Sequence, residues 1–159
     1  MVFQRSFEGE TTLLVEEMRD VRSLALGFFV GTGSASEPPG KQGMSHFLEH
    51  VLFKRTRRRS AVAIAQAMDS LGGDVDAFTT KEYTGFYAHT LDALFPEAFD
   101  LLADVVFSST FNAEDVSTER GVILEEIGEA NDNPDDLAHE TFVRSFWRGH
   151  PLGAPILGT

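Results

Sequence analysis

The segment His46-Phe-Leu-Glu-His50 places two imidazoles and a carboxylate in a pattern that can build a metal site. On a helix, with about 100° per residue, the two histidines stand about 40° apart, so both rings can reach one ion. Glu49 stands about 60° to one side of His46, so its carboxylate can lie beside the ion rather than bind it. The pattern predicts a metal centre with His46 and His50 as ligands and Glu49 as general base.

The H-x-x-E-H pattern also has a plainer explanation. Three fixed positions in five residues are only moderately specific, and a solvated helix face can hold two histidines by chance. A catalytic zinc ion takes three protein ligands and keeps its fourth position for water. A third ligand elsewhere in the chain is therefore needed to decide between the two explanations.

A helix predicted over residues 113–131 can supply that third ligand. Apolar residues recur there every seven positions and define its buried stripe: Val116, Ile123 and Ala130. Glu126 lies about 60° from Ile123, and Glu119 lies about 20° from Glu126. Glu125 points nearly opposite Ile123, out to water. Buried carboxylates need partners or a metal. Glu126 is the preferred ligand because we expect it to lie deeper among apolar neighbours, with Glu119 one layer behind; an exposed acidic helix edge is the alternative.

Composition limits the kinds of site and partner. The 159 residues include no cysteine, which excludes disulfides, thiolate ligands and cysteine nucleophiles and leaves a metal to His, Asp and Glu. The formal net charge of -12 repels nucleic acid and favours cationic partners, including basic peptides. The one basic cluster, residues 54–59 (KRTRRR), is interpreted as a solvated loop after a helix rather than a binding patch.

The length of the chain predicts one domain over residues 1–159. No apolar run approaches the roughly 18 residues that span a bilayer, so no membrane partner is expected. The first ten residues, MVFQRSFEGE, lack the apolar stretch of a secretory signal. A cytoplasmic location is therefore the expectation, although a mature form with its signal removed would look the same.

The order of elements predicts the fold class. Strands are expected over residues 11–18, 23–30, 74–80 and 84–91, and helices over 44–53, 60–71, 92–107, 113–131 and 135–148. A Gly/Pro/Ser-rich loop covers residues 31–43. Because strands and helices do not alternate regularly, we expect an α+β fold, with a mixed, largely antiparallel sheet and helices packed on one face.

These motifs resemble the pitrilysin, insulinase and mitochondrial processing peptidase superfamily. The similarity begins with HFLEH followed by LFK and continues in ERGVILEE at residues 119–126. Further matches are Gly33-Ser34, Glu37 and Gly43 before the helix, Gly72-Gly73, Ala77 and Thr79, and the final HPLG and ILGT. The resemblance implies the processing-peptidase-like metallohydrolase fold and a zinc ion held by both histidines and a glutamate 76 residues beyond the second. That glutamate is Glu126, and the family's second carboxylate falls on Glu119.

Two positions depart from the family pattern. Asp76 stands where many members have Asn, and Arg55 stands where the family's F-K-G-T has Gly. Neither is a ligand, but the first bears on how a substrate strand is held. Family members are also much longer, with a second related domain in each half and a facing half or partner subunit. The resemblance therefore implies that this chain is an N-terminal metallopeptidase domain, truncated relative to the family.

The expected function is that of a zinc-dependent endopeptidase of the inverted H-x-x-E-H (inverzincin) type, needing further domains or a partner. Glu49 would take a proton from the metal-bound water, and Glu119 would orient His50 or His46. The strand 74–80 would offer its edge to an extended peptide. The alternative is a non-catalytic metal-binding or structural subunit of the same fold. A small-molecule lyase with this motif is disfavoured because its chemistry relies on a cysteine.

Overall fold

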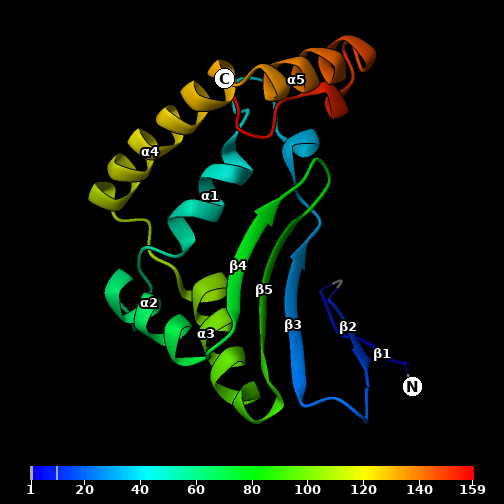
Figure 1. The fold of residues 1–159 in the computed structure, drawn as a ribbon, viewed down its shortest axis with the longest axis vertical. Coiled ribbons are helices and arrows are strands. Elements are labelled where there is room, and N and C mark those ends of the chain that lie inside the picture. The colour runs from blue at the N-terminus through cyan, green and yellow to red at the C-terminus, as the bar shows by residue number, and fades with distance from the viewer. Residues whose placement is uncertain (1, 10) are drawn as a thin grey trace.

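The computed structural model describes residues 2–9 and 11–159. Its strands are β1 (Val2–Ser6), β2 (Thr12–Glu16), β3 (Ser23–Val30), β4 (Asp74–Thr79) and β5 (Thr84–Leu91). Its α-helices are α1 (Met44–Leu52), α2 (Ala61–Ser70), α3 (Phe95–Ser108), α4 (Ala113–Asp132) and α5 (Pro134–Phe146). Short 3-10 helices cover Ser34–Ser36, Asp92–Leu94 and Pro151–Gly153. Figure 1 shows α4 and α5 at the opposite end of the molecule from the turn between β5 and α3.

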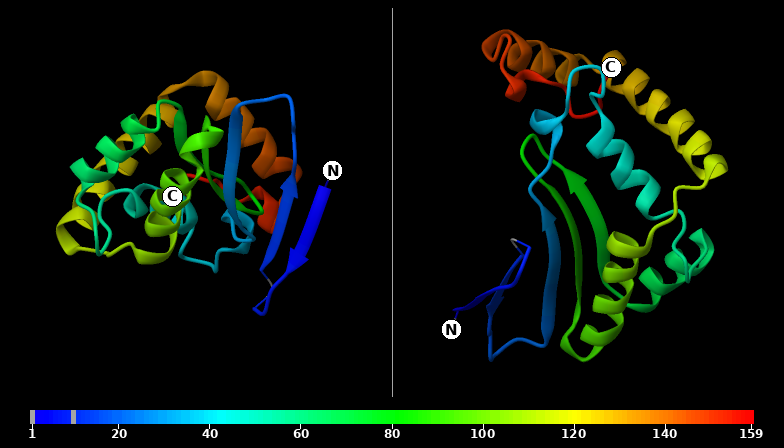
Figure 2. Two further views of the ribbon diagram at one scale, coloured as in Figure 1. Left: turned by 90° about the horizontal axis from the view of Figure 1, so that it is seen from below. Right: turned by 180° about the vertical axis from the view of Figure 1, so that it is seen from behind.

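The main sheet has the strand order β3-β5-β4, and both pairs are antiparallel. Figure 2 shows α1 to α4 gathered on one side of this sheet, whereas α5 lies across its end. The expected α+β class, with an antiparallel sheet and helices on one face, is therefore confirmed. Among the described residues, no helix is both long and apolar enough to cross a membrane.

The hydrophobic core lies between the sheet and α3. Fully buried side chains of α3 meet the inward-facing positions of the central strand, and α2 closes one side: Leu101, Leu102, Val105, Phe86, Ala88 and Ile64. The alternation of buried and exposed positions along β5 follows from the two-residue period of a strand. This packing fixes the position of β5, which pairs with β4, and α1 packs against β4.

The first strand was not expected from the sequence. β1 pairs with β2 in a separate two-stranded antiparallel sheet, with Val2 opposite Glu16 and Ser6 opposite Thr12. Every described residue of both strands is exposed, so no buried face marks the segment VFQRS as a strand. Its extended conformation comes from pairing with β2, a partner that its own five residues do not reveal.

The basic segment 54–59 is tied to neighbouring helices rather than free in solvent. Four of its five cations pair with carboxylates: Lys54 with Glu119, Arg55 with Asp115, and Arg58 and Arg59 with Asp100 and Asp104. Asp104 is buried and also accepts a 2.8 Å hydrogen bond from Thr56 Oγ1. Burial alone raises the pKa of Asp104, but the bonds from Thr56 and Arg59 outweigh it and hold that pKa below its ordinary value. The interpretation as a solvated loop is wrong in this respect, although the pairing also speaks against a binding patch.

Candidate metal centre

Helix α1 is anchored at its first residues by a carboxylate from the preceding loop. Glu37 accepts a 2.7 Å hydrogen bond from the Gly43 amide and a 2.6 Å bond from the Ser45 amide. Both donors belong to the first turn, where helix amides have no partner within the helix and a negative charge is favourable. Glu37 therefore fixes where α1 begins, and so the rotation at which His46, Glu49 and His50 leave it.

The chain segment 157–158 closes on the same point. Gly43 and Gly158 both have φ of +88°, in the left-handed region that glycine tolerates. A Cβ on Gly43 would lie 2.6 Å from the carbonyl oxygen of Leu157, and one on Gly158 would lie 2.5 Å from that of Gln42. The two backbones touch because neither glycine has a side chain, and this contact holds the residue that precedes α1.

Helix α4 runs alongside α1 and brings the carboxylates to the histidines (Figure 1). It begins at an Asn112 cap, whose Oδ1 accepts a 2.8 Å hydrogen bond from the Glu114 amide. Ile123 is buried, Glu126 lies on the side facing α1, and Glu125 is exposed. The helical periodicity therefore predicted correctly which of the two adjacent glutamates faces α1.

The structure brings together the three side chains expected to hold a metal. Ligand atoms of His46, His50 and Glu126 all lie within 4.8 Å of one another. Oε2 of Glu126 lies 3.7 Å from Nε2 of His46 and 3.6 Å from Nε2 of His50. These distances are too long for good hydrogen bonds. They are close to the roughly 3.4 Å that separates the ligands of a tetrahedral zinc ion with bonds of about 2.0–2.1 Å.

The protonation of His46 suits a metal ligand. Burial lowers the pKa of His46 below its ordinary value of 6.5, and the adjacent His50 lowers it further. The neutral imidazole that results has a lone pair to offer, which is the form that binds metals. Nδ1 of His46 is buried without a hydrogen-bond partner among the described residues, and Nε2 is the ring atom that lies near Glu126. The donor set of two imidazoles and one carboxylate fits zinc.

Glu49 lies beside the triad and is held from the sheet. Thr79 Oγ1, at the end of β4, donates a 2.5 Å hydrogen bond to Oε2 of Glu49. This contact links α1 to the strand that borders the site. In the sequence Thr79 stands out only as a family match, and its partner is not visible there because the contact joins residues 30 positions apart on different elements.

Glu119 faces His50 rather than His46. Its Oε2 lies 3.4 Å from Nδ1 of His50, and its Oε1 lies 3.0 Å from Nζ of Lys54. The expectation that Glu126 lies deeper than Glu119 is wrong, because the Glu126 side chain is 35% exposed and that of Glu119 is 5% exposed. Glu119 is covered where α4 meets the end of α1, whereas Glu126 lies at the open side of the site.

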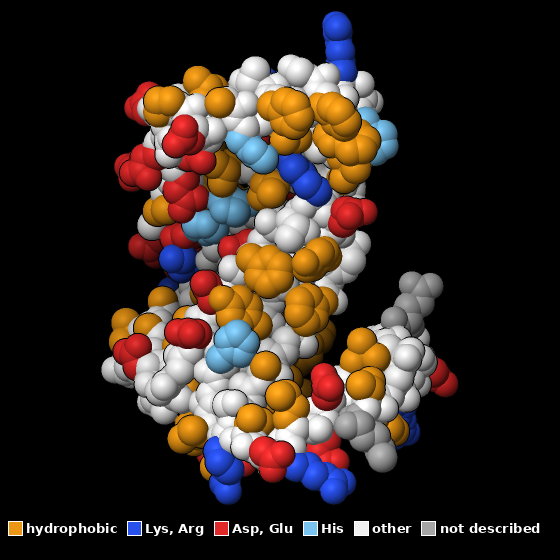
Figure 3. Space-filling model, turned by 45° about the vertical axis from the view of Figure 1, so that its right-hand side comes forward, with side chains coloured by type: hydrophobic (Ala, Val, Ile, Leu, Met, Phe, Trp, Pro, Cys, Tyr) orange, Lys and Arg blue, Asp and Glu red, His pale blue; other side chains and the backbone are white. Residues whose placement is uncertain are grey.

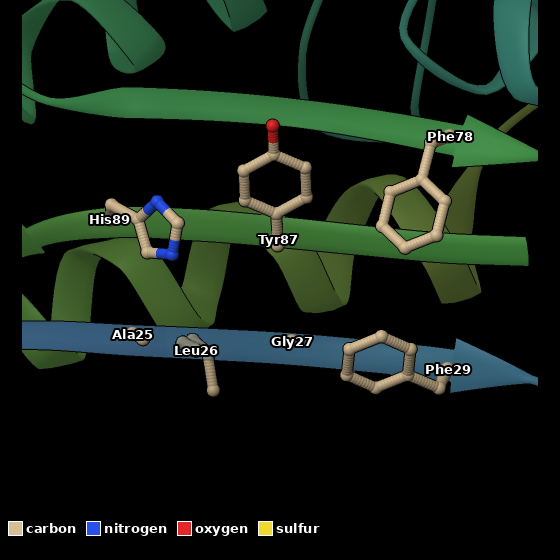
Figure 4. Close-up of a pocket in the computed structure, with 7 residues that line it drawn as sticks. All are labelled: Ala25, Leu26, Gly27, Phe29, Phe78, Tyr87 and His89. Carbon is tan, nitrogen blue, oxygen red and sulfur yellow. The ribbon is translucent and has the colours of Figure 1, made fainter.

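A separate hollow of 420 Å³ lies on the uncovered face of the main sheet. Figure 4 shows Phe29, Phe78, Tyr87 and His89 projecting from this face, with a helix behind the strands. In Figure 3, hydrophobic side chains gather over the middle of the view, and acidic side chains gather at the upper left. None of the residues lining the hollow belongs to the triad, and none is a carboxylate.

Comparison with known proteins finds a family match over most of the chain. The family model described as "Insulinase (Peptidase family M16)" matches residues 12–159. An uncharacterized zinc protease of Bacillus subtilis is 43% identical over 100% of this chain and 39% of its own length. An uncharacterized zinc protease of Mycobacterium tuberculosis is 46% identical over 95% of this chain and 34% of its own length. The chain thus spans little more than a third of the length of these relatives.

Solved structures share the fold. A protease from Helicobacter pylori superposes with a TM-score of 0.93 at 22% identity, covering 100% of this chain and 38% of that one. The structure titled as a peptidase M16 inactive domain from Pseudomonas fluorescens gives 0.87 at 23% identity, covering 99% and 38%. At these identities the likeness concerns the fold alone.

Proposed function

Because the chain belongs to the insulinase family of peptidases, family M16, we propose that it is a zinc-dependent endopeptidase domain. His46, His50 and Glu126 hold Zn²⁺ in this proposal, and Glu49 is the general base. The convergence of three ligand atoms within 4.8 Å, from helices far apart in the sequence, is the observation that carries it. The names of the relatives as zinc proteases support the choice of metal.

The proposed chemistry divides between metal and protein. A zinc ion bound at the triad would lower the pKa of its water to about 7 and polarise the scissile carbonyl. Glu49 takes the proton from the attacking water and delivers it to the leaving amine. Thr79 holds the Glu49 carboxylate in one orientation through its hydroxyl. Glu119 faces Nδ1 of His50 and thereby directs Nε2 of that ring toward Glu126.

The outer edge of β4 is the proposed place for an extended peptide. β4 pairs with β5 on one side, and among the described strands nothing pairs with its other edge. α1 packs beside β4, so a peptide added there would lie next to the triad. The Ala77 amide donates a 2.8 Å hydrogen bond to Oδ1 of Asp76. A substrate carbonyl would have to displace this carboxylate, and the excess of acidic residues would favour basic peptides.

A non-catalytic subunit of the same fold is the second candidate. The Pseudomonas fluorescens structure with this fold is described as a peptidase M16 inactive domain. The same fold therefore also occurs in a domain described as inactive. The presence here of both histidines, Glu49 and Glu126 around one point favours the catalytic reading. Since the relatives are much longer, we expect peptide hydrolysis to require further domains or a partner subunit, and zinc binding to occur without them.

The test measures zinc per chain by elemental analysis in the wild type and two variants. We expect about one zinc per chain in the wild type, its loss in Glu126→Gln and its retention in Glu125→Gln, which changes an adjacent exposed carboxylate. A wild type without zinc, after zinc is supplied and the excess removed, would contradict the proposal. Retention of zinc in Glu126→Gln would reject Glu126 as the third ligand. Loss of peptide hydrolysis in Glu49→Gln, measured in a chain of the relatives' full length with zinc retained, would identify the base.

A further inference from the structure

Lys54 continues the four-residue spacing of the two histidines just beyond the end of α1. His46, His50 and Lys54 follow one another at intervals of four residues. The two histidines lie on one face of α1, and Lys54 lies just past Leu52, the last residue of that helix. Across from them, Glu126 and Glu119 are separated by two turns of α4. The polar contacts alternate along the line where α1 meets α4: His46 with Glu126, His50 with both glutamates, and Lys54 with Glu119.

The two carboxylate oxygens of Glu119 contact different partners, an ammonium group and an imidazole. Oε1 lies 3.0 Å from the Lys54 ammonium, and Oε2 lies 3.4 Å from Nδ1 of His50. The side chain of Glu119 is only 5% exposed, so water cannot replace either partner. Among the described residues, Lys54 is the only lysine or arginine in an ion pair with Glu119. A buried carboxylate that loses its cation is strongly destabilised where it stands.

We propose that Lys54 is a positioning residue for the metal site, and that it acts by holding Glu119 against Nδ1 of His50. This inference rests on the proposed zinc site. The ammonium fixes one oxygen of Glu119, which leaves the other aimed at the imidazole and keeps Nε2 of His50 directed at Glu126. Without Lys54, the carboxylate regains solvation by turning away from α1, and His50 loses the contact that orients its ring.

The positive charge of Lys54 also acts directly on the metal, and this effect on zinc affinity is opposite to that of holding Glu119. A positive charge near a divalent cation disfavours metal binding, so its removal by itself would strengthen affinity. Lys54 is 38% exposed and the Glu119 carboxylate lies between it and His50, so water and the carboxylate screen that repulsion. Glu119 has no such access to water. The loss of orientation therefore outweighs the relief of repulsion, and zinc affinity falls.

The chain supplies a matched control in the next residue. Arg55 pairs with Asp115 of α4 at 3.0 Å, and the side chain of Arg55 is 43% exposed. Removing Arg55 deletes the same charge, at nearly the same exposure, from the same contact between α4 and the segment that follows α1. Neither Arg55 nor Asp115 contacts a histidine among the recorded ion pairs of the described residues. Substitution of Arg55 therefore reports the general cost of loosening α1 from α4.

The experiment compares zinc dissociation constants of Lys54→Met, Lys54→Arg and Arg55→Met, measured by competition with a chromophoric chelator. Thermal unfolding of each metal-free protein is measured in parallel. We expect Lys54→Met to bind zinc about tenfold more weakly, at the lower end of effects seen when outer partners of metal ligands are removed. Lys54→Arg, which keeps the cation, should recover most of the affinity, and Arg55→Met should stay within about twofold of the wild type at a similar melting temperature. Cobalt(II) absorption bands should shift in Lys54→Met alone, because they report ligand orientation.

Equal zinc affinities in Lys54→Met and Arg55→Met would overturn the inference, as would tighter binding in Lys54→Met. A loss of affinity in Lys54→Met that Lys54→Arg does not restore would also overturn it. If the wild type binds no zinc, the proposed function itself fails, which is distinguishable from failure of this inference, since the latter requires a wild type that binds normally.

Discussion

The hydroxyl of Thr79 lies 2.5 Å from Oε2 of Glu49, so the last residue of β4 donates a hydrogen bond to the carboxylate carried by α1. The strand proposed to receive substrate is thus joined to the proposed base. A substrate that aligns on β4 would be placed relative to Glu49 by the same strand that orients it.

Removal of this hydroxyl should slow catalysis without removing the metal. In a chain of the relatives' full length, we expect Thr79→Val to lower kcat about tenfold. The loss of a hydrogen bond to a charged group costs about 1.5 kcal/mol, and about 1.4 kcal/mol corresponds to a factor of ten. KM and zinc content should change little. Thr79→Ser, which keeps the hydroxyl, should retain most of the activity, and equal rates in Thr79→Val and wild type would show that the contact does not matter.

Acid should destabilise the metal-free protein through His46. Its pKa is lowered in the folded state from the ordinary 6.5, so the unfolded chain takes up a proton that the folded chain resists. Stability is therefore fully present above pH 6.5 and falls as the pH drops below it. Urea unfolding in the presence of a chelator, at pH 7.5 and at pH 5.5, measures this loss. His46→Gln should lose less stability between the two pH values, and an unchanged loss would contradict the assignment.

The buried carboxylate under the basic segment should matter more to stability than its exposed neighbour. The Asp104 side chain is 2% exposed and that of Asp100 is 48% exposed, although both pair with Arg58 and Arg59. Asp104→Asn should lower the free energy of unfolding by about 3 kcal/mol, as expected when one partner of a buried pair is removed. Asp100→Asn should cost at most about 1 kcal/mol. Equal costs in urea titrations would show that burial of Asp104 is unimportant.

Alanine substitutions at two glycines of the same loop distinguish the cost of backbone strain from the cost of a steric clash. Gly40 and Gly43 have φ of +83° and +88°, but a Cβ on Gly40 would meet nothing within 4 Å. Gly40→Ala should therefore cost only the left-handed conformation, about 1–2 kcal/mol. Gly43→Ala should cost about 1–3 kcal/mol more, because its Cβ would meet the Leu157 backbone. Denaturant unfolding of both variants checks the difference, and zinc affinity should fall only in Gly43→Ala.

Most of what could be predicted about the site from the sequence came from helical periodicity. The four-residue spacing of His46 and His50 and the position of Glu126 relative to Ile123 depend only on the regular rotation of a helix. The structure places these side chains together and leaves Glu125 exposed.

Helical periodicity could not predict the contacts between different elements. The burial of Glu119 depends on how α4 crosses α1, and the hydrogen bond from Thr79 to Glu49 depends on where β4 ends. The partner of Lys54 lies on a helix that begins about 60 residues later. Each requires the tertiary arrangement, whereas propensity and periodicity describe single elements. Arg55 is the instructive case, because the departure from the family's glycine acquires a reason only when Asp115 is seen opposite it.

The contact of Gly43 with Leu157 and Gly158 also sets an order of events during synthesis. Helix α1, with both histidines, leaves the ribosome long before Leu157 and Gly158, whose backbone contacts Gly43 just before the helix. At about 5–20 residues per second, the nascent chain waits several seconds before Glu126 and then Leu157 are made. During that interval the start of α1 has the hydrogen bonds to Glu37 but not the contact with Leu157 and Gly158. Zinc supplied to the growing chain would therefore find two ligands without the third, and we expect tight capture only after residue 158 has been added.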